Sequence, residues 1–198
     1  MAGLLTNRSA QTLMPAARGP WLVRHAQPLI GVGICYGSTD IAAHAGATQA
    51  SAEVLALELP QATRVLCSPL QRCTQLAEPL ARLRPDLHLC IDKRLVEMDF
   101  GCWEGWRWDA IPKSALDEWT ADFAHWRFGG RESVAELMRR VAEVWTETCA
   151  REDPVAWITH AGVIRAATLV AGGKREVLRS EDWPTEVVGF GQLVRLPR

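Results

Sequence analysis

Four side chains that suit a phosphate ion follow three short apolar runs of the chain. Arg24 and His25 end the first run. Arg72 lies shortly after the second run, and His160 directly follows the third. Guanidinium groups bind phosphoryl oxygens through charge-assisted hydrogen bonds, and imidazole rings can bind the same oxygens. If the three runs end at one place, these residues form a pocket for a tetrahedral anion.

The three runs are expected to be strands of a parallel sheet, because short apolar runs alternate along the chain with helical stripes. The carboxyl ends of parallel strands line one crevice, and helix N-termini there favour an anion. The predicted fold class is therefore α/β, a mostly parallel open sheet sandwiched between helices. A small Trp-rich insertion should cover the active-site end. We expect strands at residues 21–23, 64–67, 87–91 and 155–159, one or two more within residues 186–196, and the insertion at residues 98–131.

Capping signals and one proline bear on the expected helices. Ser68 suits the N-cap of a helix that begins at Pro69, and Pro79 should kink or shorten this helix. Ser133 and Glu136 fit a capping box at the start of a longer helix. This longer helix covers residues 132–149, and another helical stripe covers residues 46–59.

A general acid is expected beside the anion pocket. Glu97, Asp99 and Glu104 compete for this role. Glu97 directly follows Leu95 and Val96, and apolar neighbours raise the pKa of a carboxyl towards that of a useful general acid. Glu104 lies in a Trp-Glu-Gly turn, which also suits a structural role. Glu97 is the preferred candidate.

Four separated motifs occur in order between about residues 21 and 170. They are Leu22-Val-Arg-His25, Ser68-Pro-Leu-Gln-Arg72, Glu97-x-Asp-Phe-Gly-x-Trp-Glu-Gly105 and Thr159-His-Ala-Gly162. Together they resemble the histidine phosphatase superfamily, also called phosphoglycerate mutase-like proteins. The segment Cys35-Tyr-Gly-Ser-Thr-Asp40 is most similar to the α-ribazole phosphatase branch. The chain departs from the usual opening, because Ala26 and Pro28 replace the glycine and the Ser or Thr, and the phosphate-binding asparagine of mutases has no evident counterpart.

The resemblance implies a role for each matched residue. His25 would be the nucleophile, with its Nδ1–H held by a backbone carbonyl so that Nε2 faces the phosphorus. Arg24, Arg72 and His160 would bind the non-bridging oxygens, and Glu97 would protonate the leaving alkoxide and then activate water. No cofactor and no metal are expected, so chelators should not affect activity. The expected substrate pocket adds the wall residues Tyr36, Gly37, Ser38, Trp103 and Trp106. Trp108, which also follows the expected acid, is a further candidate for an apolar wall beside a ring-bearing substrate.

The resemblance implies a phosphatase that acts on a small phosphorylated metabolite through a phosphohistidine. The substrate would be α-ribazole phosphate or a cobalamin phosphate precursor. Two alternatives remain, namely a phosphoglycerate mutase-type phosphotransferase and a non-catalytic subunit that binds a phosphorylated ligand. The missing asparagine favours water as the phosphoryl acceptor.

Composition excludes several other classes of function. The 22 basic and 23 acidic side chains give a net charge of −1, which provides no basic field for nucleic acid or for a membrane surface. Six scattered cysteines indicate reduced thiols in a cytoplasmic protein. We expect residues 1–19 to form a disordered or loosely attached leader and residues 20–198 to form one domain, as a monomer or homodimer.

Overall fold

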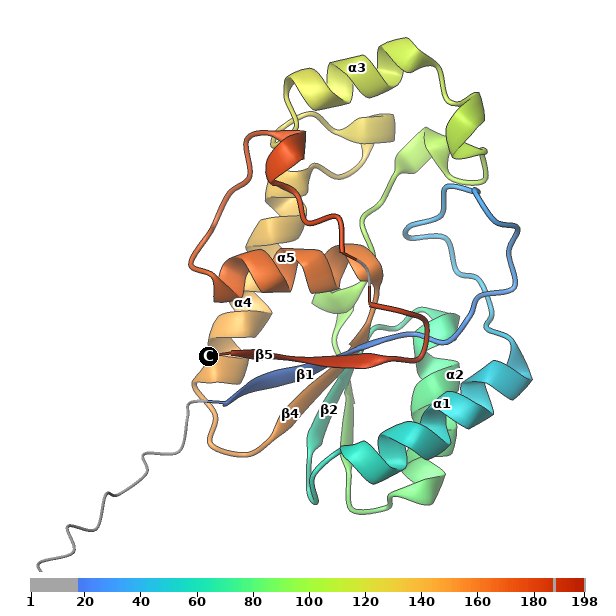
Figure 1. The fold of residues 1–198 in the computed structure, drawn as a ribbon, viewed down its shortest axis with the longest axis vertical. Coiled ribbons are helices and arrows are strands. Elements are labelled where there is room, and N and C mark those ends of the chain that lie inside the picture. Colours follow the sequence, from blue (N-terminus) through green and yellow to red (C-terminus); the bar gives the residue numbers. More distant parts are fainter. Residues whose placement is uncertain (1–17, 187, 198) are drawn as a thin grey trace, which may run out of the picture.

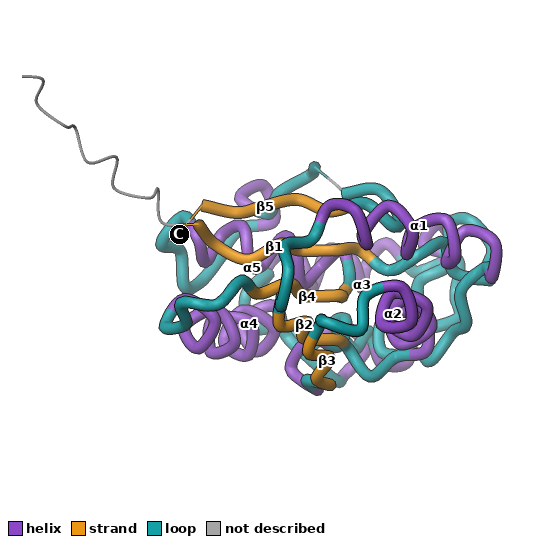
Figure 2. Tube along the Cα trace, turned by 90° about the horizontal axis from the view of Figure 1, so that it is seen from below, coloured by secondary structure: helices purple, strands orange, loops and turns teal. Residues whose placement is uncertain are grey.

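A computed structural model describes residues 18–186 and 188–197 of the chain. Most of the leader expected at residues 1–19 therefore lies outside the described residues. The described part contains a sheet of five strands in the order β3-β2-β4-β1-β5, which Figure 2 shows from β5 at the top to β3 at the bottom. The strands are β1 (Arg18–Arg24), β2 (Arg64–Cys67), β3 (His88–Ile91), β4 (Val155–Thr159) and β5 (Leu193–Pro197).

The sheet is mostly parallel, as predicted. Strands β1 to β4 run in one direction, and β5 pairs with β1 in the opposite direction. The predicted limits of β2 and β4 are confirmed, and the C-terminal region supplies one strand within the described residues. Strand β1 begins at Arg18, earlier than predicted, because Arg18 still pairs with Pro197 of β5.

Helices cover both faces of the sheet, and Figure 1 shows α1 and α2 gathered on one side and α4 and α5 on the other. The long helices are α1 (Ala45–Glu58), α2 (Gln71–Leu83), α3 (Lys113–Ala121), α4 (Val134–Cys149) and α5 (Ala161–Ala171). Short 3-10 helices lie at Lys93–Leu95, Gly101–Trp103, Trp108–Ala110, Phe128–Gly130 and Ser180–Asp182. No helix of the described residues is both long enough and apolar enough to cross a bilayer.

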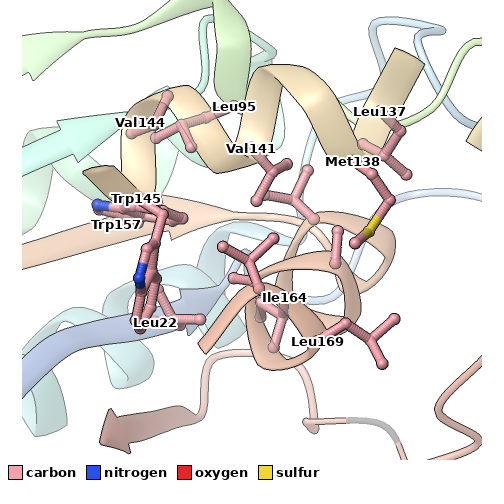
Figure 3. Packing of buried hydrophobic residues seen from close by; sticks show 14 of the residues in the cluster. Leu22, Leu95, Leu137, Met138, Val141, Val144, Trp145, Trp157, Ile164 and Leu169 are labelled. Carbon is pink, nitrogen blue, oxygen red and sulfur yellow. The ribbon is translucent and has the colours of Figure 1, made fainter. Parts of the chain in front are cut away.

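The two faces have separate cores because side chains alternate along each strand. Leu22 and Trp157 belong to the core that packs under α4 and α5, which Figure 3 shows around Val141 and Ile164. Val23 and its neighbours on β2 and β4 face α1 and α2 instead. All five residues of β4 are buried, as expected of a central parallel strand.

The helix predictions were correct for α4 and partly wrong for α2. Ser133 and Glu136 form the predicted capping box of α4. Helix α2 starts at Gln71 rather than at Pro69, and Leu70 is its N-cap residue. Ser68 therefore does not cap the helix, and its side chain is turned towards His160. Pro79 lies inside α2, which continues beyond it to Leu83.

The Trp-rich segment folds as an aromatic unit that includes α3, drawn at the top of Figure 1. Phe128 is fully buried at its centre and stacks on Trp119 with ring centroids 4.5 Å apart. Gly129 has a φ of 74°, and a Cβ there would lie 1.9 Å from the carbonyl oxygen of Phe100. This close backbone approach ties the unit to the segment that carries Glu97.

Candidate active site

The carboxyl ends of β1, β2 and β4 meet because β4 lies between the other two strands. His25 follows β1 and His160 follows β4, and their ring centroids are 5.2 Å apart. Arg72, in the first turn of α2, donates from Nε to Nδ1 of His160 over 3.2 Å. Arg24, His25 and Arg72 line one cavity of about 420 Å³. The structure thus brings the four predicted residues together.

His25 is held in the tautomer that nucleophilic attack requires. The ring is 2% exposed, and Nδ1 lies 2.7 Å from the carbonyl oxygen of Ala26. Because a carbonyl only accepts, Nδ1 carries the proton and Nε2 keeps its lone pair. Burial lowers the pKa of His25 to about 3; the bond to Ala26 opposes this shift, and the charges of Arg72 and Arg24 reinforce it. The imidazole is therefore neutral at physiological pH.

Arg24 is fixed by the C-terminal segment and by Tyr36. Its Nη1 donates to the carbonyl oxygen of Val188 over 3.0 Å, and its Cζ lies 3.8 Å from the ring centroid of Phe190. Burial lowers the pKa of Arg24, and the neighbouring Tyr36 opposes this shift. Its Nε is buried without a hydrogen-bond partner among the described residues. A buried donor without a partner costs free energy, and an anion in the cavity would relieve that cost.

Arg72 is fully buried and donates to two carbonyl oxygens, of Thr39 over 2.8 Å and of Gly37 over 2.6 Å. The ring centroid of Tyr36 lies 5.3 Å from its guanidinium carbon. Arg72 therefore depends on the loop of residues 36–39 for its position.

Glu104 holds that loop and has a structural role, as its turn suggested. Its carboxylate accepts from the backbone N–H groups of Ser38 over 2.9 Å, Thr39 over 2.6 Å and Phe100 over 3.0 Å. The hydroxyls of Ser38 and Thr39 also donate to it. Burial acts to raise the pKa of Glu104, but the bonds from Thr39, Ser38 and Phe100 outweigh it, so the pKa is lowered. An ionised carboxylate with these partners suits a clamp better than a general acid.

Glu97 is the carboxylate that lines the cavity, whereas Asp99 and Glu104 do not. It is 8% exposed, and it accepts from the backbone N–H of Met98 over 3.0 Å and of Gly162 over 2.8 Å. A Cβ on Gly162 would lie 2.3 Å from its Oε1, so any larger residue at the start of α5 would displace the Glu97 carboxylate. The geometry favours Glu97 over Asp99, whose carboxylate accepts from Gly101.

The apolar wall of the cavity differs from the predicted one. Tyr36 lines the cavity, while Gly37 and Ser38 serve as backbone supports behind it. Trp103 and Trp106 do not line it; they pack on each other with ring centroids 5.5 Å apart. Trp108, also a candidate from the sequence, does line it. The other aromatic residues that join Tyr36 in the wall are Phe100, Trp119, Phe123 and Trp183.

Sequence reasoning also missed three polar lining residues, Thr120, Arg165 and Ser180. Arg165 follows Gly162 by one helical turn and faces the same cavity, which its spacing on α5 could have indicated. Its Nε and Nη2 donate weakly to the carbonyl oxygens of Glu186 and Thr185, over 3.3 and 3.4 Å. Ser180 reaches the cavity from a distant loop, and no local pattern signals it.

No group of three His, Cys, Asp or Glu side chains in residues 18–186 and 188–197 is arranged to hold a metal ion. The charges that face an anion here come from Arg24, Arg72 and Arg165.

A family model for the histidine phosphatase superfamily (branch 1) matches residues 21–181. The chain therefore belongs to the histidine phosphatase superfamily, a class that the fold and the paired histidines and arginines also fit.

Several known proteins are similar to the chain. A 6-phosphofructo-2-kinase/fructose-2,6-bisphosphatase of Caenorhabditis elegans is 35% identical over 106 residues, which are 52% of this chain and only 22% of that protein. A mycobacterial glucosyl-3-phosphoglycerate phosphatase is 27% identical with a TM-score of 0.66, over 78% of this chain and 79% of that one. A "putative alpha-ribazole-5'-P phosphatase" from Escherichia coli has a TM-score of 0.72 at 21% identity, over 88% and 87%, and shares the fold.

Proposed function

We propose that this protein hydrolyses small phosphomonoesters through a phosphohistidine on His25. The observation that carries the proposal is the neutral His25, whose Nδ1 is bound to Ala26 and whose ring faces a cavity shared with Arg24, Arg72 and Glu97. A ligand-binding protein needs no nucleophile or proton donor, so these groups favour catalysis over simple binding.

The first half of the reaction transfers the phosphoryl group to the protein. Nε2 of His25 attacks phosphorus in line, and the bond from phosphorus to the ester oxygen breaks. Arg24 and Arg72 stabilise charge on the non-bridging oxygens from fixed positions. Glu97 donates its proton to the leaving oxygen, which otherwise departs as an unstable alkoxide.

The second half regenerates the protein. Glu97, now ionised, takes a proton from water as the water attacks phospho-His25. Inorganic phosphate leaves, and Glu97 is again protonated. No step requires a metal ion, because two guanidinium groups supply the positive charge.

The aromatic wall indicates the class of substrate. Trp108, Trp119 and Trp183 line the cavity beyond the phosphate-binding residues, together with Phe100 and Phe123. Flat aromatic surfaces favour a flat, apolar leaving group. A ring-bearing alcohol therefore fits better than a small carboxylate such as 3-phosphoglycerate. We propose α-ribazole phosphate, or a related cobalamin phosphate precursor, as the first substrate to test.

The experiment measures phosphate release from α-ribazole phosphate, glucosyl-3-phosphoglycerate, an aryl phosphate and 3-phosphoglycerate, with and without EDTA. We expect the ring-bearing esters to have the highest kcat/KM and EDTA to have no effect. Trp183→Ala should raise KM for the ring-bearing esters, whereas the control Trp106→Ala should not, because Trp106 is 48% exposed and lies outside the cavity. Binding without turnover of any ester would contradict a phosphatase, and phosphoryl transfer between phosphoglycerates would indicate a mutase.

A further inference from the structure

Both ring nitrogens of His160 have partners inside the protein. Nδ1 accepts from Nε of Arg72 over 3.2 Å, and Nε2 lies 2.8 Å from Oγ of Ser68. A guanidinium group only donates, so Nδ1 must hold a lone pair. In the neutral ring the proton is then on Nε2, which donates to the Ser68 hydroxyl. His160 is fully buried, and burial together with the Arg72 charge lowers its pKa well below the usual range.

This tautomer conflicts with the role that the family resemblance implies for His160 in the proposed reaction, which is to bind a non-bridging phosphoryl oxygen. Nδ1 is the nitrogen beside Arg72, which lines the cavity. Nε2 points away into the core, between Ser68 and Sγ of Cys73, which is 3.5 Å from it. A lone pair on Nδ1 would repel a phosphoryl oxygen. His160 can donate to that oxygen only if Nδ1 acquires a proton.

We propose that phosphate binding switches the tautomer of His160, and that Ser68 is the positioning residue that allows the switch. In the free protein Nε2–H donates to Ser68 Oγ. In the complex Nδ1–H donates to a phosphoryl oxygen, and the Ser68 hydroxyl turns to donate to Nε2. One proton passes from Nε2 to water and one passes from water in the cavity to Nδ1, so water neither gains nor loses a proton overall and the ring stays neutral. Nε of Arg72, released from Nδ1, turns to the same anion.

Ser68 is suited to this role because a hydroxyl can both accept and donate. It is fully buried, and its Oγ also accepts from the N–H of Leu70 over 3.4 Å, a bond that both tautomers permit. Cys73 cannot replace it. Burial raises the pKa of the Cys73 thiol well above the usual range, and this weak donor already contacts the carbonyl oxygen of Thr159. This role would explain why Ser68 contacts His160 instead of capping α2.

The inference rests on the proposed function, and nitrogen-15 NMR of the unmodified protein tests it separately. The chain has five histidines, so the ring signals can be assigned with single His variants. For His160 of the free protein we expect protonated Nε2 and unprotonated Nδ1. With saturating inorganic phosphate, whose binding is followed by phosphorus NMR, we expect the reverse. Protonated Nδ1 in the free protein, or bound phosphate without a change, would overturn the inference while leaving phosphohistidine chemistry intact. If inorganic phosphate does not bind, the proposed pocket fails and the switch fails with it.

Variants separate positioning from general stability. Ser68→Ala leaves Nε2 without its oxygen partner. We expect kcat to fall about 10–100-fold, the loss that is typical when a metal-ligating histidine loses its hydrogen-bonded support. The control Thr63→Val removes the buried hydroxyl that precedes β2, where Thr63 Oγ1 donates to Pro60 over 2.8 Å. It should lower the thermal midpoint to a similar extent without changing kcat or the His160 signals. Equal kinetic losses in both variants, or a normal phosphate response of His160 in Ser68→Ala, would contradict the role of Ser68.

Discussion

Replacing Glu97 with glutamine tests the assignment of the general acid. The carboxylate accepts one backbone N–H at each oxygen, from Met98 over 3.0 Å and from Gly162 over 2.8 Å. Glutamine keeps the shape and one acceptor, but its NH₂ group faces the other N–H donor. The loss of that bond should lower the free energy of unfolding by about 1–3 kcal/mol.

The kinetic cost should be larger and should depend on the leaving group. Loss of general acid catalysis reduces the rate about 10²–10⁴-fold, which corresponds to about 2.7–5.4 kcal/mol of transition-state stabilisation. An alkyl phosphate needs the proton and should show this full loss in the first turnover. A 4-nitrophenyl phosphate has a leaving group that is stable as an anion. The fold-reduction of its first-turnover rate should therefore be at least about ten times smaller than that for the alkyl phosphate.

Rapid-quench measurement of alcohol release separates the first turnover from the slow hydrolysis of phospho-His25. The control Glu143→Gln changes an exposed carboxyl on α4 and should leave both rates unchanged. Equal losses of the first-turnover rate with alkyl and aryl phosphates would refute the role of Glu97 as acid and leave it a structural group at the start of α5.

Three further predictions concern charge, packing and loop position. Burial lowers the pKa of His25 from 6.5 to about 3; the bond to Ala26 opposes this shift, and the charges of Arg72 and Arg24 reinforce it. Between these two pH values the unfolded chain binds more protons than the folded chain, so the free energy of unfolding rises with pH. In denaturant titrations His25→Asn should flatten this rise by up to about 1.4 kcal/mol per pH unit, and an unchanged slope would argue against a buried neutral imidazole. Phe128→Ala should lower the free energy of unfolding by about 3–5 kcal/mol, because the ring is fully buried, and a loss below about 1 kcal/mol would show that the aromatic unit is not well packed. Glu104→Gln should loosen residues 36–39 and reduce kcat/KM about 10–100-fold by misplacing the guanidinium they hold, whereas normal kinetics would show that the loop is fixed in another way.

The sequence predicted the parts of the fold that depend on local patterns. Strands β2 and β4 were located to the residue, because each is a short apolar run bounded by polar or helix-starting residues. The capping box at Ser133 and Glu136 was also found from spacing alone. The proximity of His25 and His160 was predicted from the topology, because residues that follow parallel strands meet at one edge of the sheet.

The parts that were missed depend on contacts between distant segments. The sequence placed Trp103 and Trp106 at the substrate wall because they follow Glu97 closely, but their rings pack on each other outside the cavity. Trp183 reaches the wall from the C-terminal region, and nothing near it in the chain signals this position. Ser68 looked like a helix cap, and only the neighbouring His160 explains why it is turned elsewhere.

The most direct test of the phosphatase mechanism is to trap the covalent intermediate. The protein is mixed with a labelled aryl phosphate, quenched in alkali to preserve a phosphohistidine, digested and analysed by mass spectrometry. We predict one phosphoryl group on the peptide that contains His25, absent after acid treatment and absent from His25→Asn. Turnover of the ester without any phosphoryl label on His25, or full activity of His25→Asn, would contradict the mechanism.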